Sequence, residues 1–168
     1  DDVAVNENVG SAQNSYPGAG SIVHLRPNAD GDIVLWTNTY TNIDEVTPND
    51  ATDFISSTTL DQVEEAGVEE PDSVGIRSSD TINVLNVGIR GRTSSATLNS
   101  SAALRLKSTS NGTLLEPSAG FLTPTGGAWA TNRDASSSAF HYLLSSYNKP
   151  EGGGVWTPTN LSTVQIGV

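Results

Sequence analysis

The chain has 168 residues, a formal net charge of -11 and no cysteine. This acidity argues against a nucleic-acid groove or a polybasic membrane surface, because both need clustered Lys and Arg. The lack of cysteine excludes disulfides, zinc–thiolate sites and thiol nucleophiles. Hydrophobic residues make up 35% of a chain rich in Ser and Thr, which favours a thin β fold over a thick helical core. No apolar run approaches the roughly 20 residues that a membrane span needs.

The N-terminal residues 1–20 carry no core pattern apart from Val3-Ala4-Val5, and they end in the turn-rich stretch Tyr16–Gly20. Two interpretations are open: a flexible tail, as is common at chain termini, and an extended arm that pairs with a neighbouring subunit. We therefore divide the chain into an N-terminal arm, residues 1–20, and a β-sandwich domain, residues 21–168.

The domain is expected to begin with a strand over Ser21–Arg26, ended by Pro27, which cannot donate to a ladder. Asn28–Asp32 reads as a turn, and Ile33–Thr41 as a second, alternating strand. The turn also resembles a short calcium loop, but it has Gly in the fourth position and Thr39 in the twelfth, where an EF-hand has Gly in the sixth and Glu in the twelfth. An Asx-stabilised turn is therefore favoured over a calcium site.

The next segment, Asn42–Ile55, is an acidic loop. It carries four carboxylates, at Asp44, Glu45, Asp50 and Asp53. Paired carboxylates are what glycoside hydrolysis needs, but catalytic pairs usually converge from separate strands. We interpret the loop as a solvated connection with capping contacts, and a metal or subunit contact stays open as an alternative.

A central strand is predicted over Thr81–Arg92, where Leu85, Val87 and Ile89 alternate with polar residues. This spacing places an aliphatic row on the inner face of an antiparallel sheet whose other face is wet. The preceding segment, Ser56–Asp80, is rich in carboxylates and poor in apolar residues, so we expect an irregular, exposed connection with a helical turn near Asp61.

The second half of the chain continues with short strands and turns. We expect a strand over Ala102–Lys107 with Leu104 and Leu106 inward, followed by a hairpin turn at Asn111-Gly112. A further strand is expected over Ala139–Leu144. A helical turn with Thr157 as N-cap and Pro158 in first position then leads to a last strand over Val164–Val168. Short strands with frequent turns are typical of a sandwich or jelly roll. The expected fold is all-β: an antiparallel β-sandwich, jelly-roll-like, with an extended N-terminal arm.

Enzyme templates fail on this sequence. His24 and His141 stand alone, and the chain has no Gly-x-Ser-x-Gly elbow, P-loop or dinucleotide fingerprint. We therefore expect no catalytic, cofactor-binding or metal-binding residue. Trp36, Trp129 and Trp156 are interpreted as core or rim residues rather than as a sugar-stacking platform.

Three Asn residues match the glycosylation acceptor pattern, namely Asn99, Asn111 and Asn160. Such matches are frequent by chance in a chain rich in Ser and Thr.

Several stretches occur in an order and spacing that resembles a family of β-sandwich proteins in tailed-phage and prokaryotic genomes. The matching stretches are Leu25–Asn28 with Gly31, Asp32 and Trp36, then Ile43–Glu45, Pro48–Ile55, the strand Ile82–Arg92, and Trp156-Thr157 with Leu161 and Val164–Val168. The resemblance covers residues 22–168 and implies a virion or surface structural protein, with no catalytic residues to carry over. Family members continue into a further turn and a closing strand, which implies an open sheet edge beside Thr163–Val168.

We therefore expect a non-enzymatic structural subunit of a repeated surface assembly, on a virion or outside the cell. The assembly would be a bacteriophage virion component, as capsid decoration (cement) or tail appendage, or an extracellular filament held by β-strand contacts between subunits. An open edge is a template for such contacts. The residues expected at the contact are Val3, Val5, Val9, Val164, Ile166 and Val168.

The expected partners are copies of the chain, as a homo-oligomer, and other assembly proteins. Nucleic acid, a membrane span and a cofactor are not expected, and a surface glycan stays open. A carbohydrate-binding module is the alternative function, and an acidic hydrolase is a weaker third.

Overall fold

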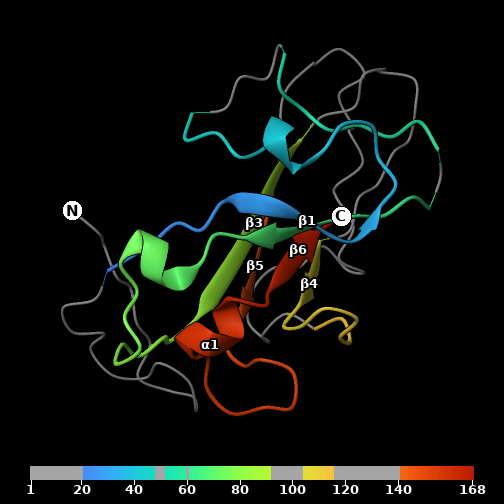
Figure 1. The fold of residues 1–168 in the computed structure, drawn as a ribbon. Helices are drawn as coiled ribbons and strands as arrows, with labels where there is room; N and C mark the ends of the chain where they lie inside the picture. Colours follow the sequence, from blue (N-terminus) through green and yellow to red (C-terminus); the bar gives the residue numbers. More distant parts are fainter. Residues whose placement is uncertain (1–20, 48–51, 60, 92–103, 116–140) are drawn as a thin grey trace.

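The structure, a computed structural model, describes residues 21–47, 52–59, 61–91, 104–115 and 141–168, and of residues 141–144 it describes the backbone (Figure 1). Its strands are β1 (Pro27–Val34), β2 (Glu64–Val68), β3 (Leu85–Gly91), β4 (Arg105–Lys107), β5 (His141–Tyr147) and β6 (Gln165–Gly167). The helical turns are η1 (Tyr40–Asn42), η2 (Pro71–Val74) and α1 (Pro158–Leu161). The strands form antiparallel sheets, so the part of the chain that the structure describes agrees with the expected all-β class.

The first sheet has four strands in the order β1-β2-β6-β4. The last strand, β6, lies inside this sheet, where Ile166 pairs with Ala66 of β2 on one side and with Leu106 of β4 on the other. Glu64 and Val168 extend the β2–β6 pairing through reciprocal backbone hydrogen bonds of 3.0 Å. The expectation of an open edge at the C-terminal strand is therefore wrong, because both of its sides are hydrogen-bonded.

Three rows of side chains cross the interior of this sheet, because directly opposed residues point to the same face. The middle row, Ala66–Ile166–Leu106, is apolar. The rows on either side of it, Glu65–Gly167–Arg105 and Gly67–Gln165–Lys107, point to the opposite face and are polar. One face of the sheet is therefore apolar and the other carries charges.

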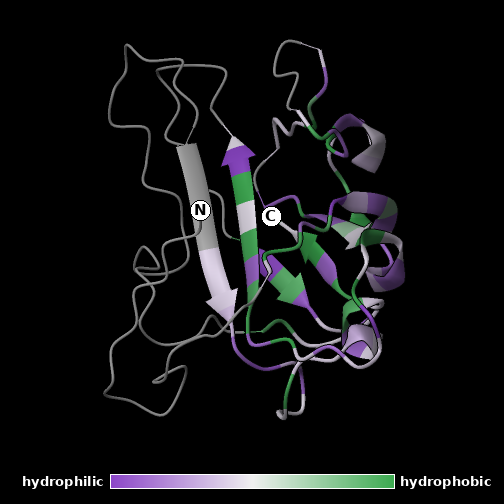
Figure 2. Cartoon of the chain, turned by 90° about the vertical axis from the view of Figure 1, so that its left-hand side faces the viewer, coloured by the Kyte–Doolittle hydropathy of each residue, from purple (hydrophilic) through white to green (hydrophobic). Residues whose placement is uncertain are grey.

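The second sheet is the pair β3–β5, in register from Leu85 opposite Tyr147 to Gly91 opposite His141. Apolar and polar residues alternate along β3, as Figure 2 shows. Val87 is buried and Leu85 packs against the same core, whereas Asn86 and Gly88 are exposed. A central strand is thus confirmed over Leu85–Gly91, with Leu85 and Val87 inward, but it starts four residues later than predicted, and Ile89 is only half-buried.

Both sheets contribute to one apolar cluster. It contains Val68, Val87, Leu106, Tyr147, Trp156, Leu161 and Val164, with partly buried Leu25, Ile76, Ile82, Leu85, Leu104, Leu115 and Ile166 against it. Trp156 is 1% exposed, pairs with Ile82 in an isolated bridge, and donates its indole N–H to the backbone oxygen of Tyr147 at 2.8 Å. Its interpretation as a core residue is confirmed.

The beginning of the domain differs from the prediction. Ser21–Arg26 is not a strand, and the polar segment read as a turn, Asn28–Asp32, lies within β1. Pro27 starts this outer strand, a position where proline is tolerated. Register shifts interrupt the ladder on both sides of Ala29 and Asp30, so turn-forming residues here mark bulges rather than a chain reversal.

Two further segments also differ. The expected strand Ile33–Thr41 ends at Val34, and after it Thr37 makes only an isolated bridge with Ser56. The segment Ser56–Asp80, expected to be irregular and exposed, contains β2, in which four of five residues are buried. Its helical turn is η2, not a turn near Asp61.

The ends of several predicted elements are confirmed. Thr157 caps α1 through a reciprocal capping box with Asn160, and Pro158 is the first helical residue. Asn111 adopts a left-handed conformation, φ 55°, in the expected turn. Residues 1–20 lie outside the described residues, so the N-terminal arm stays a prediction.

Candidate functional site

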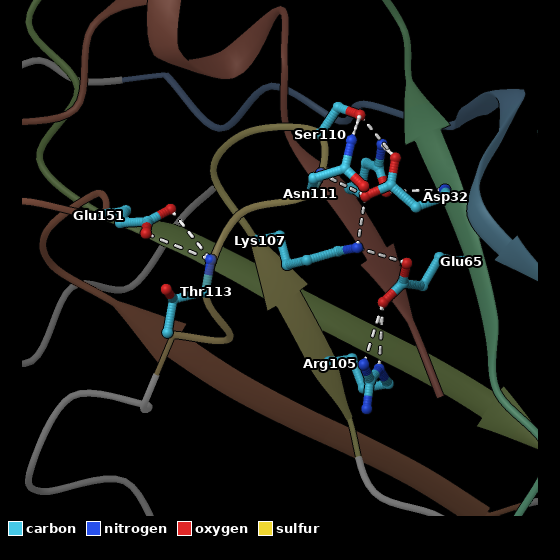
Figure 3. A network of polar contacts seen from close by, with 9 residues as sticks. Asp32, Glu65, Arg105, Lys107, Ser110, Asn111, Thr113 and Glu151 are labelled. Carbon is cyan, nitrogen blue, oxygen red and sulfur yellow. Dashed lines mark hydrogen bonds and ion pairs between the residues drawn. The ribbon is translucent and has the colours of Figure 1, made fainter.

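The most unusual cluster in the structure is a buried network of charges on the polar face of the four-stranded sheet (Figure 3). The Lys107 ammonium lies between two carboxylates, with Nζ 2.7 Å from Asp32 Oδ2 and 2.6 Å from Glu65 Oε2. Glu65 also accepts a hydrogen bond from Nε of Arg105 and pairs with its NH2, each at 3.2 Å. The side chains of Glu65 and Lys107 are 1% and 6% exposed, so water screens them little.

Glycine makes the centre of this network geometrically possible. Gly167 of β6 stands directly between Glu65 and Arg105 in the row that crosses the sheet. Because it has no side chain, the two charged groups reach each other over the intervening strand. A Cβ built at Gly167 would lie 2.0 Å from the backbone oxygen of Glu64, so β2 and β6 also approach too closely there for any other residue.

Asp32 of β1 contacts three other segments of the chain: β4, the turn at Ser110-Asn111, and β6. Its Oδ1 accepts hydrogen bonds from Ser110 Oγ at 2.6 Å and from Gln165 Nε2 at 2.9 Å. Its Oδ2 accepts the backbone N–H of Asn111 and contacts Lys107, and its own N–H donates to Gln165 Oε1 at 3.0 Å. Although Asp32 as a whole residue is exposed, its side chain is only 15% exposed.

These contacts determine the protonation of both groups. Hydrogen bonds from Lys107, Ser110, Asn111 and Gln165, in that order, hold the pKa of Asp32 well below its usual range. Burial alone would lower the pKa of Lys107, but the carboxylates of Asp32 and Glu65 outweigh burial and raise it. The pair is therefore an ammonium and a carboxylate at neutral pH.

Two further carboxylates, Glu64 at the start of β2 and Glu69 just after its end, bind backbone groups. Glu64 is 4% exposed, and its Oε2 accepts the N–H groups of Leu35 and Trp36, each at 2.9 Å. Burial raises the pKa of Glu64 and outweighs these two hydrogen bonds. Glu69 instead accepts from the side chain and backbone N–H of Arg26, and these hydrogen bonds lower its pKa.

The residues predicted at a subunit contact lie elsewhere. Val164 is 3% exposed in the core cluster, and Ile166 packs against that cluster. Val168 follows β6 and is half-buried. Val3, Val5 and Val9 lie outside the described residues. The contact of these six residues with another subunit stays a prediction.

The other candidate residues show no convergence in the described part of the chain. The backbone oxygen of Asp44 accepts from NH1 of Arg26 at 3.3 Å, while Asp50 lies outside the described residues. Trp36 is half-buried and donates its indole N–H to the backbone oxygen of Gln62 at 3.2 Å. Because Trp156 is enclosed in the core, it is not available for a sugar platform with Trp36.

Sequence reasoning missed the charge network, although one signal for it was present. Arg105 and Lys107 are two residues apart in a predicted strand, which places both on the face opposite Leu106. Two cations side by side on a strand need anions opposite them. The acidic segment Gln62–Glu70 holds such anions, but nothing local indicates that it pairs with this strand.

The chemistry of the network is that of carboxylates, an amine and hydroxyl or amide donors. No group of three or more His, Asp or Glu residues is placed to hold a metal ion in the described ranges. Within the same ranges, no helix is long and apolar enough to cross a membrane. A comparison of the chain with protein-family models, with curated proteins and with solved structures finds no match.

Proposed function

We propose that the chain is a non-enzymatic structural subunit of a repeated surface assembly, with a virion component favoured over an extracellular filament. The observation that supports this most is the use of the buried charges. The two carboxylates of Asp32 and Glu65 neutralise the two cations of Lys107 and Arg105 and connect β1, β2 and β4. Glu64 binds backbone N–H groups. Such contacts brace a sheet, whereas catalytic groups present a perturbed carboxyl or base toward a substrate.

The finer architecture belongs to the same proposal. We infer that the two antiparallel sheets are the two layers of a jelly-roll-like sandwich. The support is the shared cluster, in which Val87 of β3 and Tyr147 of β5 join Val68 of β2 and Leu106 of β4. An experimental structure that places the pair β3–β5 face to face over the four-stranded sheet would agree, and one that extends the four-stranded sheet edge to edge would not.

Residues 1–20 are proposed as the arm that holds neighbouring subunits together. Since β6 has partners on both sides, the arm needs another docking surface. Deleting residues 1–16 should abolish assembly without lowering the melting temperature of the isolated domain. A truncated chain that assembles with unchanged stability would exclude strand exchange by the arm.

Electron microscopy of native material labelled with gold-conjugated antibody against the chain tests the function itself. The expected result is label at regular intervals on a particle or filament. A glycan array addresses the alternative carbohydrate-binding module. The carbohydrate-binding module would replace the structural function if two results occur together. One is saturable binding to one polysaccharide that is lost in Trp36→Ala but kept in Trp36→Phe, and the other is antibody label confined to unassembled protein.

A further inference from the structure

The buried contact between Lys107 and Asp32 brings together an amine and a carboxyl group, the two partners of an amide bond. We propose that they condense into an intramolecular isopeptide bond between Lys107 Nζ and Asp32 Cγ, with Glu65 as the base that transfers the second proton. The bond would covalently join β4 to β1, the two outer strands of the four-stranded sheet. A chain without cysteine has no disulfide for this purpose. The inference does not depend on the assembly function.

The first argument is the position of Glu65 as a base. Its Oε1 is held by Arg105 at 3.2 Å, while its Oε2 lies 2.6 Å from Lys107 Nζ as an ion pair and accepts no hydrogen bond. This distance is within the reach that proton transfer requires. The 1% exposure of the Glu65 side chain keeps bulk water from competing for the proton.

The second argument is the set of donors around Asp32, which identifies Asp32 rather than Glu65 as the acyl group. Ser110 Oγ and Gln165 Nε2 both donate to Oδ1, at 2.6 and 2.9 Å. These donors are placed to stabilise the negative charge that develops on Oδ1 when an amine adds to Cγ, as in an oxyanion hole. Oδ2 faces Lys107 at 2.7 Å and is the oxygen that departs.

The reaction balances without any further reactant. One proton passes from the Lys107 ammonium to Asp32 Oδ2 along their 2.7 Å hydrogen bond. The lone pair of Nζ then attacks Cγ, and the electron pair of the C=O bond moves to Oδ1, where Ser110 and Gln165 hold it. A second Nζ proton reaches Oδ2 through Glu65, the Cγ–Oδ2 bond breaks, and one water leaves. An ammonium and a carboxylate become a neutral amide, and nothing is oxidised or reduced.

The resting charges of the pair slow this reaction but do not prevent it. Asp32 is ionised and Lys107 is protonated, so the neutral amine is a minor species that forms by proton transfer to Asp32. One bond per chain is sufficient, and the reaction is not repeated. Fixed contact between reacting groups corresponds to effective concentrations on the order of 10⁵–10⁸ M, which lowers the barrier to attack on Cγ.

The intact mass of the purified, denatured wild-type chain tests the proposal directly. The expected mass is lower than the sequence mass by one water molecule. Trypsin then provides the location, since Lys107 in an amide is no longer a cleavage site. The digest should contain residues 106–133 joined to the peptide that carries Asp32. A wild-type chain with the full sequence mass overturns the proposal.

Three variants distinguish a mass loss caused by the Lys107–Asp32 bond from a loss of water elsewhere in the chain. Lys107→Arg keeps the positive charge but has no primary amine, and it should have its full sequence mass; a loss of water that persists there comes from cyclisation elsewhere and overturns the proposal. Glu65→Gln should also have its full mass, and a cross-linked Glu65→Gln chain contradicts the role of Glu65. The exposed Lys149 provides the matched control, because Lys149→Arg should still lose one water. Far-UV circular dichroism verifies that each variant is folded.

Discussion

The two sheets are stabilised by different chemistry. In the pair β3–β5 the buried side chains that the structure describes are uncharged: Val87 and Tyr147 are 3% and 1% exposed, and Ser145 and Ser146 of β5 are buried beside them. The four-stranded sheet buries Leu106 on one face, but on its other face it buries Glu65 and Lys107, at 1% and 5% exposed. Hydrophobic burial is not directional, so a truncated side chain loses only its own contacts and leaves a cavity. A buried charge depends on a named partner, and losing that partner costs more than the pair contributes.

The largest expected effect is in the charged sheet. Glu65→Ala removes the carboxylate that faces both Lys107 and Arg105. Breaking a buried pair costs about 3–5 kcal/mol of unfolding free energy, and Glu65→Ala breaks the Glu65–Arg105 pair whether Lys107 is joined to Asp32 or free. Urea denaturation measures the change. Glu70→Ala, at an exposed site, should change stability by less than about 0.5 kcal/mol, and equal effects of the two variants would show that the network does not brace the sheet.

The second prediction tests whether the charged sheet depends on its close strand approach. Gly167→Ala places a Cβ 2.0 Å from the backbone oxygen of Glu64, so β2 and β6 must separate. Such overpacking costs about 1–3 kcal/mol, occasionally more, and we expect the upper end since the obstacle is backbone. Gly67→Ala is the control in the same sheet, because its Cβ would meet its nearest neighbour, Ala29 Cβ, at 3.5 Å. In thermal denaturation, the melting temperature of Gly67→Ala should be equal to or above that of the wild type.

The third prediction concerns the apolar sheet. Val87→Ala should lower the unfolding free energy by about 1–3 kcal/mol, through lost burial and a residual cavity. Val155→Ala makes the same chemical change at a residue that is 69% exposed, and it should have almost no effect. If the Val87 and Val155 variants unfold at the same urea concentration, the inward row of β3 is not part of the core.

The same difference in chemistry explains what was readable from the sequence. The strand β3 was predictable because its alternation of Leu85, Val87 and Ile89 is a local signal for one buried face. The strand β2 was not, because Glu64-Glu65 resembles a solvated surface. Its burial depends on Arg105, which lies 40 residues further along the chain. A local sequence pattern cannot indicate a partner at that separation. An apolar face can therefore be predicted from a local sequence pattern, whereas a buried charge can be predicted only when its partner is known.

The strand β1 shows the other way in which tertiary contacts override local signals. Pro27 and Gly31 are turn-forming residues, yet both lie in a strand. A Cβ at Gly31 would lie 2.6 Å from the backbone carbon of Glu65, so this glycine permits close approach of β1 to β2. Strand pairing with β2 decided the conformation, because propensity is weaker than pairing. The network position of Asp32 was missed for the same reason.

The smallest expected effects are pH-dependent and come from two carboxylates at either end of β2. Glu69 has a lowered pKa because Arg26 donates to it, so its contribution to stability is present above the ordinary value of 4.5 and is lost as pH falls below it. Glu64 has a raised pKa because of burial, so its contribution is present below 4.5 and is lost as pH rises through its folded value. Glu69→Gln should therefore be more destabilising at about pH 7 than at about pH 3, and Glu64→Gln should show the reverse order. Urea denaturation of each variant and wild type at both pH values measures these differences. If the destabilisation of both variants relative to wild type changes in the same direction between the two pH values, the opposite environments assigned to Glu64 and Glu69 are incorrect.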